Sequence, residues 1–211
     1  MIDPFTLADH YGVDQLRYFF LREVPFGQDG NYSHEAIVNR INADLANDLG
    51  NLAQRSLSMI AKNLDGKAPT RGALTEADQA LLNDAYALPE KARVSMQNFS
   101  LHLMLADLWR VVADANRYFA SEEPWVKRKS DPERFETVLS VTIEALRVVG
   151  IMAQPVIPVA ASSLLDLVGA RHDKRNFADV TAANAIAAGT QLPSPSPIFP
   201  RYVEAETEKA E

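Results

Sequence analysis

The stretch SHEAIVNRINADLANDLGNLAQRSLSMIAKN, residues 33–63, decides the fold of this chain. Apolar side chains recur along it at helical spacing: Ile37, Ile41, Leu45, Leu49, Leu52 and Ile60. Ser33 stands where a helix N-cap belongs, and Asp65-Gly66 follows the last periodic residue. The pattern predicts one long amphipathic helix whose apolar stripe packs against other elements.

Helical signals continue beyond this stretch. Thr75 and Asp78 resemble a capping box that opens a helix, which we expect Pro89 to disturb. Ser100 and Asp131 each precede a further periodic run, and a shorter helix is expected over 158–169. No alternating strand pattern and no internal repeat is found. The sequence therefore predicts an all-α fold, a bundle of about five helices.

The two ends of the chain differ from this bundle. Two short helices are expected over 3–24, too small to fold alone and so docked on other elements. Residues 193–200 alternate proline with other residues, so an extended segment is expected, with Ile198 and Phe199 inserted as anchors. The acidic residues 204–211 are expected to be a solvated end. We divide the chain into 1–32, the helical domain 33–192, and the extended segment with its acidic tail, 193–211.

Composition excludes several classes of protein. The 211 residues are 47% hydrophobic and 23% charged, as in an ordinary globular domain, and include no cysteine. Disulfides, thiolate metal sites and cysteine nucleophiles are therefore excluded. The histidines lack the spacing of a metal-binding helix, so we predict no metal site: they are His10, His34, His102 and His172. With no signal peptide visible, a cytoplasmic setting is expected.

One uncharged run raises the question of a membrane span. Eighteen residues without a charge lie between Arg147 and Asp166, about the shortest length for a spanning helix. Pro155 and Pro158 interrupt the run, and each removes a backbone donor. We predict two buried helices joined at a proline corner, and no membrane association.

Neither enzyme motifs nor a broad basic field is visible. The sequence contains no G-x-G-x-x-G, no P-loop and no G-x-S-x-G, so no catalytic residue is predicted. The net charge is −7, but the negative charge is concentrated in 1–35 and 204–211, whereas 36–203 is neutral. Extended binding to a phosphate backbone is disfavoured. A small local contact with RNA stays open.

Three polar residues of the long helix share one face. Asn47, Asn51 and Arg55 are spaced four apart, on a face distinct from the apolar stripe. An amide offers a donor and an acceptor and a guanidinium offers a planar fork, the groups that read base edges. The alternative is an Asn–Arg ladder bonded to a neighbouring helix or loop.

Trp125 is the other unusual position. It follows Pro124, which we expect to end the preceding helix, and it precedes the cations of 127–129. The stretch 116–129 has a net charge of +2. A tryptophan just past a helix end and beside cations can stack on an unpaired base. The alternative is a ring that covers the core under lysine stems; Trp109, inside a helix, is assigned to the core.

Blocks in this order together resemble methionyl-tRNA synthetases: Asp14–Phe19, Arg22–Gly30, Asn39–Arg55, Asn116–Tyr118 and Glu123–Trp125. The resemblance implies a five-helix anticodon-binding domain, preceded in 1–32 by part of the stem-contact region. It implies that Asn51 and Arg55 hydrogen-bond anticodon bases and that Trp125 stacks on the first base of CAU. Weaker RNA contacts would come from Asn47, Arg117 and Lys127.

The family's catalytic half has no counterpart in this sequence. Its nucleotide-binding sheet, His-Ile-Gly-His type motif, zinc-bearing insertion and Lys-Met-Ser-Lys-Ser loop are all missing. The resemblance implies a longer enzyme that joins L-methionine to initiator and elongator methionine tRNA with ATP and Mg²⁺. This stretch would then hold no cofactor, form no adenylate and work with a catalytic domain in cis. A monomer is expected, because the dimerising module of some members is missing.

Two alternatives stay open. The first is a stand-alone helical RNA-binding or scaffold module, which would not discriminate between tRNAs. The second is the anticodon domain of another class I synthetase, such as those for valine or leucine. It would discriminate, but for a different anticodon.

Overall fold

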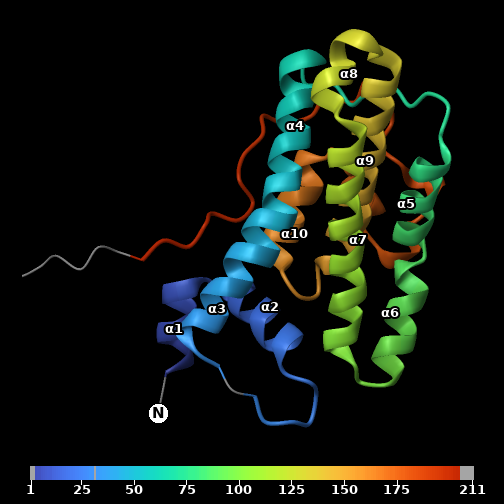
Figure 1. Ribbon diagram of the computed structural model, residues 1–211. Helices are drawn as coiled ribbons and strands as arrows, with labels where there is room; N and C mark the ends of the chain where they lie inside the picture. Colours follow the sequence, from blue (N-terminus) through green and yellow to red (C-terminus); the bar gives the residue numbers. More distant parts are fainter. Residues whose placement is uncertain (1–2, 31, 205–211) are drawn as a thin grey trace, which may run out of the picture.

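The structure is a computed structural model that describes residues 3–30 and 32–204. Long helical segments pack side by side, and two short helices dock near one end of them (Figure 1). Within the described residues no strand is present, and one isolated backbone bridge joins Lys67 to Gln191. The prediction of an all-α fold is confirmed.

The first long segment is continuous from His34 to Asn63. It consists of α3 (His34–Arg40), the π-helical turns of η1 (Ile41–Gly50) and α4 (Asn51–Asn63). Ser33 is its N-cap, and the Ser33 hydroxyl accepts from the Ala36 N–H at 3.1 Å. The predicted boundaries of this helix are confirmed, but the π-helical stretch in its middle was not foreseen.

Side chains of a second helix, α7 (Leu101–Glu122), bond to the π-helical stretch. Trp109 Nε1 donates to the Asp44 carbonyl at 3.0 Å. Asn116 Nδ2 donates to the Asp48 carbonyl at 3.0 Å. Both carbonyls belong to η1, so α7 satisfies backbone acceptors within these turns.

The segment between these helices contains two helices rather than one. α5 (Glu76–Tyr86) begins with the predicted capping box, because the Thr75 N–H donates to Asp78 Oδ2 at 2.8 Å and Thr75 Oγ1 accepts from the Asp78 N–H. α6 (Leu88–Gln97) starts afresh, with Pro89 in its first turn. Proline is tolerated there because first-turn N–H groups have no helical partner. The expected disturbance at Pro89 is thus a complete break.

The most buried helix is α9 (Pro132–Ala153), which contacts α4, α5, α7, α8 and α10. It follows the short helix α8 (Pro124–Ser130) and begins at Asp131, whose carboxylate accepts from the Arg134 N–H. α10 (Pro158–Leu167) follows after the predicted proline corner. Three 3₁₀ turns come next, at His172–Lys174, Phe177–Asp179 and Ala182–Asn184. No helix in the described ranges is long and apolar enough to cross a membrane.

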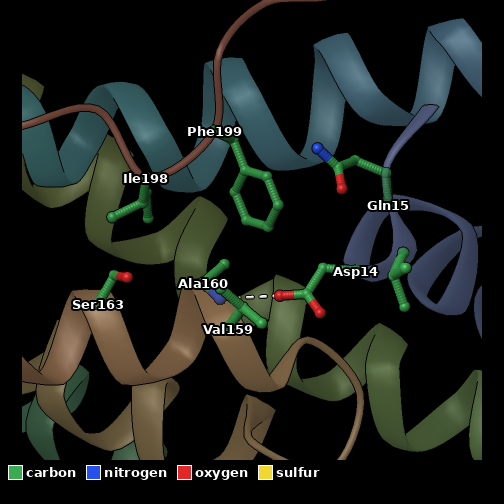
Figure 2. Close-up of a pocket in the computed structure, with 8 residues that line it drawn as sticks. Asp14, Gln15, Val159, Ala160, Ser163, Ile198 and Phe199 are labelled. Carbon is green, nitrogen blue, oxygen red and sulfur yellow. Dashed lines mark hydrogen bonds between the residues drawn. The ribbon is translucent and has the colours of Figure 1, made fainter. Parts of the chain in front are cut away.

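The N-terminal helices α1 (Pro4–Tyr11) and α2 (Val13–Glu23) dock on the bundle, as expected. Asp14 Oδ2 accepts from the Ala160 N–H at 2.8 Å, at the start of α10 (Figure 2). Arg17 donates to the carbonyls of Pro155 and Val156, at 2.6 and 2.9 Å, on the proline corner.

The extended C-terminal segment also packs where α2 meets the start of α10. The side chains of Ile198 and Phe199 point toward α10 and Asp14 in Figure 2, and Phe199 is buried in the core while Ile198 is half-buried. The Asn42 side chain bonds the Tyr202 N–H and carbonyl, at 2.8 and 3.3 Å. The predicted anchors are confirmed. Of the predicted acidic end, residues 205–211 lie outside the described residues.

Candidate nucleic-acid interface

The three polar residues singled out on the long helix are all exposed. Asn47 lies in η1, and Asn51 and Arg55 lie in α4. Within the described residues, none of these three side chains makes a hydrogen bond or an ion pair. The ladder to a neighbouring helix is therefore not formed in this structure, and the amide and guanidinium groups remain available to a ligand.

Arg55 instead lies against two aromatic rings. Its guanidinium carbon is 5.1 Å from the ring centroid of Phe119 and 5.7 Å from that of Trp125. The two rings are 6.2 Å apart and inclined at 56°. We call Arg55, Phe119 and Trp125 the aromatic cluster. Cations at these distances from a ring face are attracted to it.

Trp125 is 41% exposed and lies just past the end of α7, as expected. It sits in the first turn of α8, a short helix that the sequence analysis did not foresee. Glu123 adopts a left-handed conformation (φ 45°) between α7 and α8, and Pro124 starts the new helix. Trp109 is buried in the core, as expected.

A network of ion pairs and hydrogen bonds links residues of α5, α7 and α9 and reaches α8 through Lys127. Arg134 donates to Asp78 at 2.5 and 2.8 Å and to Glu122 at 2.8 and 3.0 Å. Tyr118 donates to Asp78 at 2.6 Å, and Lys127 pairs with Glu122 at 3.1 Å. We call these five residues the Arg134 network.

The network shifts the titration of its acids. Burial raises the pKa of Asp78, but hydrogen bonds from Arg134, Tyr118 and the Thr75 backbone outweigh it and lower that pKa to about 2. The Arg134 hydrogen bond likewise lowers the pKa of Glu122. Both carboxylates are therefore ionised at neutral pH.

Two weaker predicted RNA contacts already have carboxylate partners. Arg117 pairs with Asp114, and Lys127 pairs with Glu122. Their positive charge is partly neutralised locally, whereas Arg55 pairs with no carboxylate in the part of the chain that the structure describes. Phe119 was not among the RNA-binding candidates chosen from the sequence. Its aromatic type near the end of α7 was the available signal.

The described residues include no group of three or more histidine, aspartate or glutamate side chains that could hold a metal ion. The aromatic cluster and the nearby amides contain no nucleophile paired with a base. Their chemistry suits recognition by stacking and hydrogen bonding rather than a covalent step.

Comparison with known protein families shows to which family the chain belongs. Residues 68–211 match the family described as the anticodon binding domain of methionyl tRNA ligase, and residues 1–57 match the class I tRNA synthetases for methionine. The chain belongs to the methionyl-tRNA ligase family. Asn51 and Arg55 fall within the second match, and Trp125 falls within the first.

Individual members of the family agree over nearly the whole chain. The methionine–tRNA ligase of Brucella melitensis is 65% identical over 98% of this chain, which corresponds to 40% of that protein. The Rhizobium meliloti enzyme is 52% identical over 98% of this chain and again 40% of its own length. The chain thus spans about 40% of the length of these relatives.

Solved structures of the family share the fold. The apo methionyl-tRNA synthetase of Mycobacterium tuberculosis has a TM-score of 0.93 and 51% identity, over 97% of this chain and 42% of that one. The same enzyme in complex with methionyl-adenylate has a TM-score of 0.91 and 52% identity, over 95% and 40%. The resemblance read from the sequence is confirmed.

Proposed function

We propose that this chain recognises the CAU anticodon of methionine tRNA. The observation that carries the proposal is Trp125, a half-exposed indole that lies against a guanidinium with no carboxylate partner among the described residues. Sequence-specific RNA recognition uses unpaired bases that stack on aromatic rings and bond at their edges. The aromatic cluster, with Asn51 on the same helix as Arg55, offers both kinds of contact.

Each residue has a distinct role in this proposal. Trp125 stacks on the first anticodon base, an interaction that contributes about 1–3 kcal/mol per base. Asn51 and Arg55 bond base edges, because the Asn51 amide both donates and accepts and the Arg55 fork donates. Asn47, Arg117 and Lys127 make weaker RNA contacts. Helices hold these groups more rigidly than loops would.

We propose that this recognition is one function of a longer enzyme of the family. That enzyme joins L-methionine to initiator and elongator methionine tRNA, using ATP and Mg²⁺, acts as a monomer and works in the cytoplasm. The remaining length of the relatives, about 60% of it, would supply the catalytic domain in cis. The proposal assigns no catalytic residue and no step with ATP or Mg²⁺ to this chain.

Binding to RNA stem-loops tests the proposal. The chain is titrated at low salt with a loop carrying CAU and with the same loop changed at its first anticodon base. We expect a preference for CAU that Trp125→Ala and Asn51→Ala each reduce by about 1–3 kcal/mol. Asn83→Ala is the matched control, because Asn83 is an exposed asparagine of α5, away from the aromatic cluster.

Two other outcomes would contradict the proposal. Equal binding to both loops, unchanged by Trp125→Ala, indicates a helical module with generic RNA affinity. A preference for a different anticodon indicates another class I synthetase.

A further inference from the structure

Phe119 is a fully buried side chain that nonetheless contacts both exposed members of the aromatic cluster. We propose that Phe119 is a positioning residue for RNA recognition: it holds Arg55 against one face of Trp125, so that the opposite face is the one on which a base stacks. This inference rests on the proposed function and assigns the open face of the indole.

The geometry brings three helices to one point. Arg55 comes from α4, Phe119 from the last turn of α7 and Trp125 from the first turn of α8. The guanidinium lies over the faces of both rings, at 5.1 and 5.7 Å. Phe119 is therefore the one buried member that anchors the other two.

The stacking of Arg55 on these two rings depends on the planar shape of its guanidinium. A planar guanidinium that stacks on a ring keeps its N–H donors in its own plane, where they reach the edge of a neighbouring base. Arg55 has no carboxylate partner within the described residues to pull it away from the rings. A residue that merely filled the core would not need a π face at this position.

An aliphatic residue in place of Phe119 would fill the core but lose this function. Leucine has no quadrupole to attract the Arg55 cation, so the guanidinium would rotate away and both faces of the indole would become accessible. A base would then stack on an indole whose partner Arg55 is not held in place. Discrimination between the CAU loop and the changed loop would fall. Preorganised partners bind better because less ordering is required on binding.

The main test compares Phe119→Leu with Phe19→Leu. Phe19 is equally buried but belongs to a separate cluster with Tyr11, Leu16, Ile37 and Ile41. Each variant loses the same atoms from a core, so the control matches the loss of packing. The two differ in the contact with Arg55 and Trp125.

The first measurement is acrylamide quenching of tryptophan fluorescence without RNA. Trp109 is 7% exposed and Trp125 is 41% exposed, so the quencher reports mainly on Trp125. We expect the quenching constant to rise in Phe119→Leu and to stay at the parent value in Phe19→Leu. An unchanged constant in Phe119→Leu would overturn the proposal, whether or not the chain binds RNA.

The second measurement is the ratio of affinities for the CAU loop and for the loop changed at its first anticodon base. Phe119→Leu should lower this ratio about two- to fivefold, the loss expected from one cation–π contact, and Phe19→Leu should leave it unchanged. Arg55→Met should lower it as well. If Arg55→Met instead tightens binding, Arg55 competes with the base and the inference is wrong. If Trp125→Ala leaves the ratio unchanged, the proposed function itself fails.

Discussion

Two arginines near the same end of the bundle have opposite environments. Arg134 is largely buried and bonds two carboxylates, Asp78 and Glu122. Arg55 is exposed and lies against two aromatic rings, with no ion pair in the described part of the chain. The N–H donors of Arg134 are used in bonds that join helices. Those of Arg55 stay available for a ligand.

One helix carries both environments. Tyr118 and Phe119 are neighbours on α7, but Tyr118 donates to the Arg134 network while Phe119 packs in the aromatic cluster. Adjacent residues on a helix point about 100° apart, so a single helix serves two faces. The Arg134 network reaches α8 through Lys127, and α8 also carries Trp125 of the aromatic cluster.

The largest effect is expected from Arg134→Ala. Removing the cation leaves Asp78 and Glu122 without their main partner, and breaking a buried pair in this way costs about 3–5 kcal/mol. Urea unfolding measures the change, with Arg93→Ala, in an exposed pair with Glu90, as the control. A loss below about 1 kcal/mol would show that the Arg134 network is no stronger than a surface pair.

The pH dependence of stability tests the Asp78 carboxylate of the same network. The folded pKa of Asp78, about 2, lies below its ordinary value of 3.8. Ionised Asp78 therefore stabilises the fold above about pH 4, by roughly 2 kcal/mol, and this stability is lost as the pH falls from about 4 to about 2. Unfolding free energies of the parent chain and Asp78→Asn should differ at pH 6 and converge near pH 2. A constant difference would contradict the assignment.

Arg55→Ala should separate the two environments most sharply. We expect it to lower stability by only about 0.5–1 kcal/mol, the size of an exposed cation–π contact, yet to reduce the preference for the CAU loop. Thermal unfolding and stem-loop binding measure the two effects on the same sample. A stability loss as large as that of Arg134→Ala would erase the distinction between the two arginines.

The smallest effect is expected from Arg117→Ala. Arg117 is exposed and already pairs with Asp114, so its removal should change stability by no more than about 0.5 kcal/mol. The RNA contact proposed for Arg117 is a weak one, so the preference for CAU should stay within measurement error. A clear loss of preference would make Arg117 a primary RNA contact.

Much of the fold could be predicted because its signals are local. Ser33 caps the long helix, Asp131 caps α9, and Gly12 separates α1 from α2 with a φ of 94° that glycine adopts readily. Pro89 showed the limit of this reasoning, since a proline signals a disturbance but not whether the chain bends or starts a new helix. The exposure of Asn51 and Arg55 also followed from helical periodicity.

The sequence by itself determined most of the helices and several of their caps, because these depend on neighbours a few positions away. It also indicated the family, through blocks spread along the chain, and it predicted Asn51, Arg55 and Trp125 as RNA contacts. The tertiary structure alone decided the π-helical turns of η1, which Trp109 and Asn116 of α7 support, and the choice of partners for each arginine. Long side chains reach whatever the packing of distant helices brings near them. That is why Arg134 bonds carboxylates and Arg55 lies against Phe119 and Trp125.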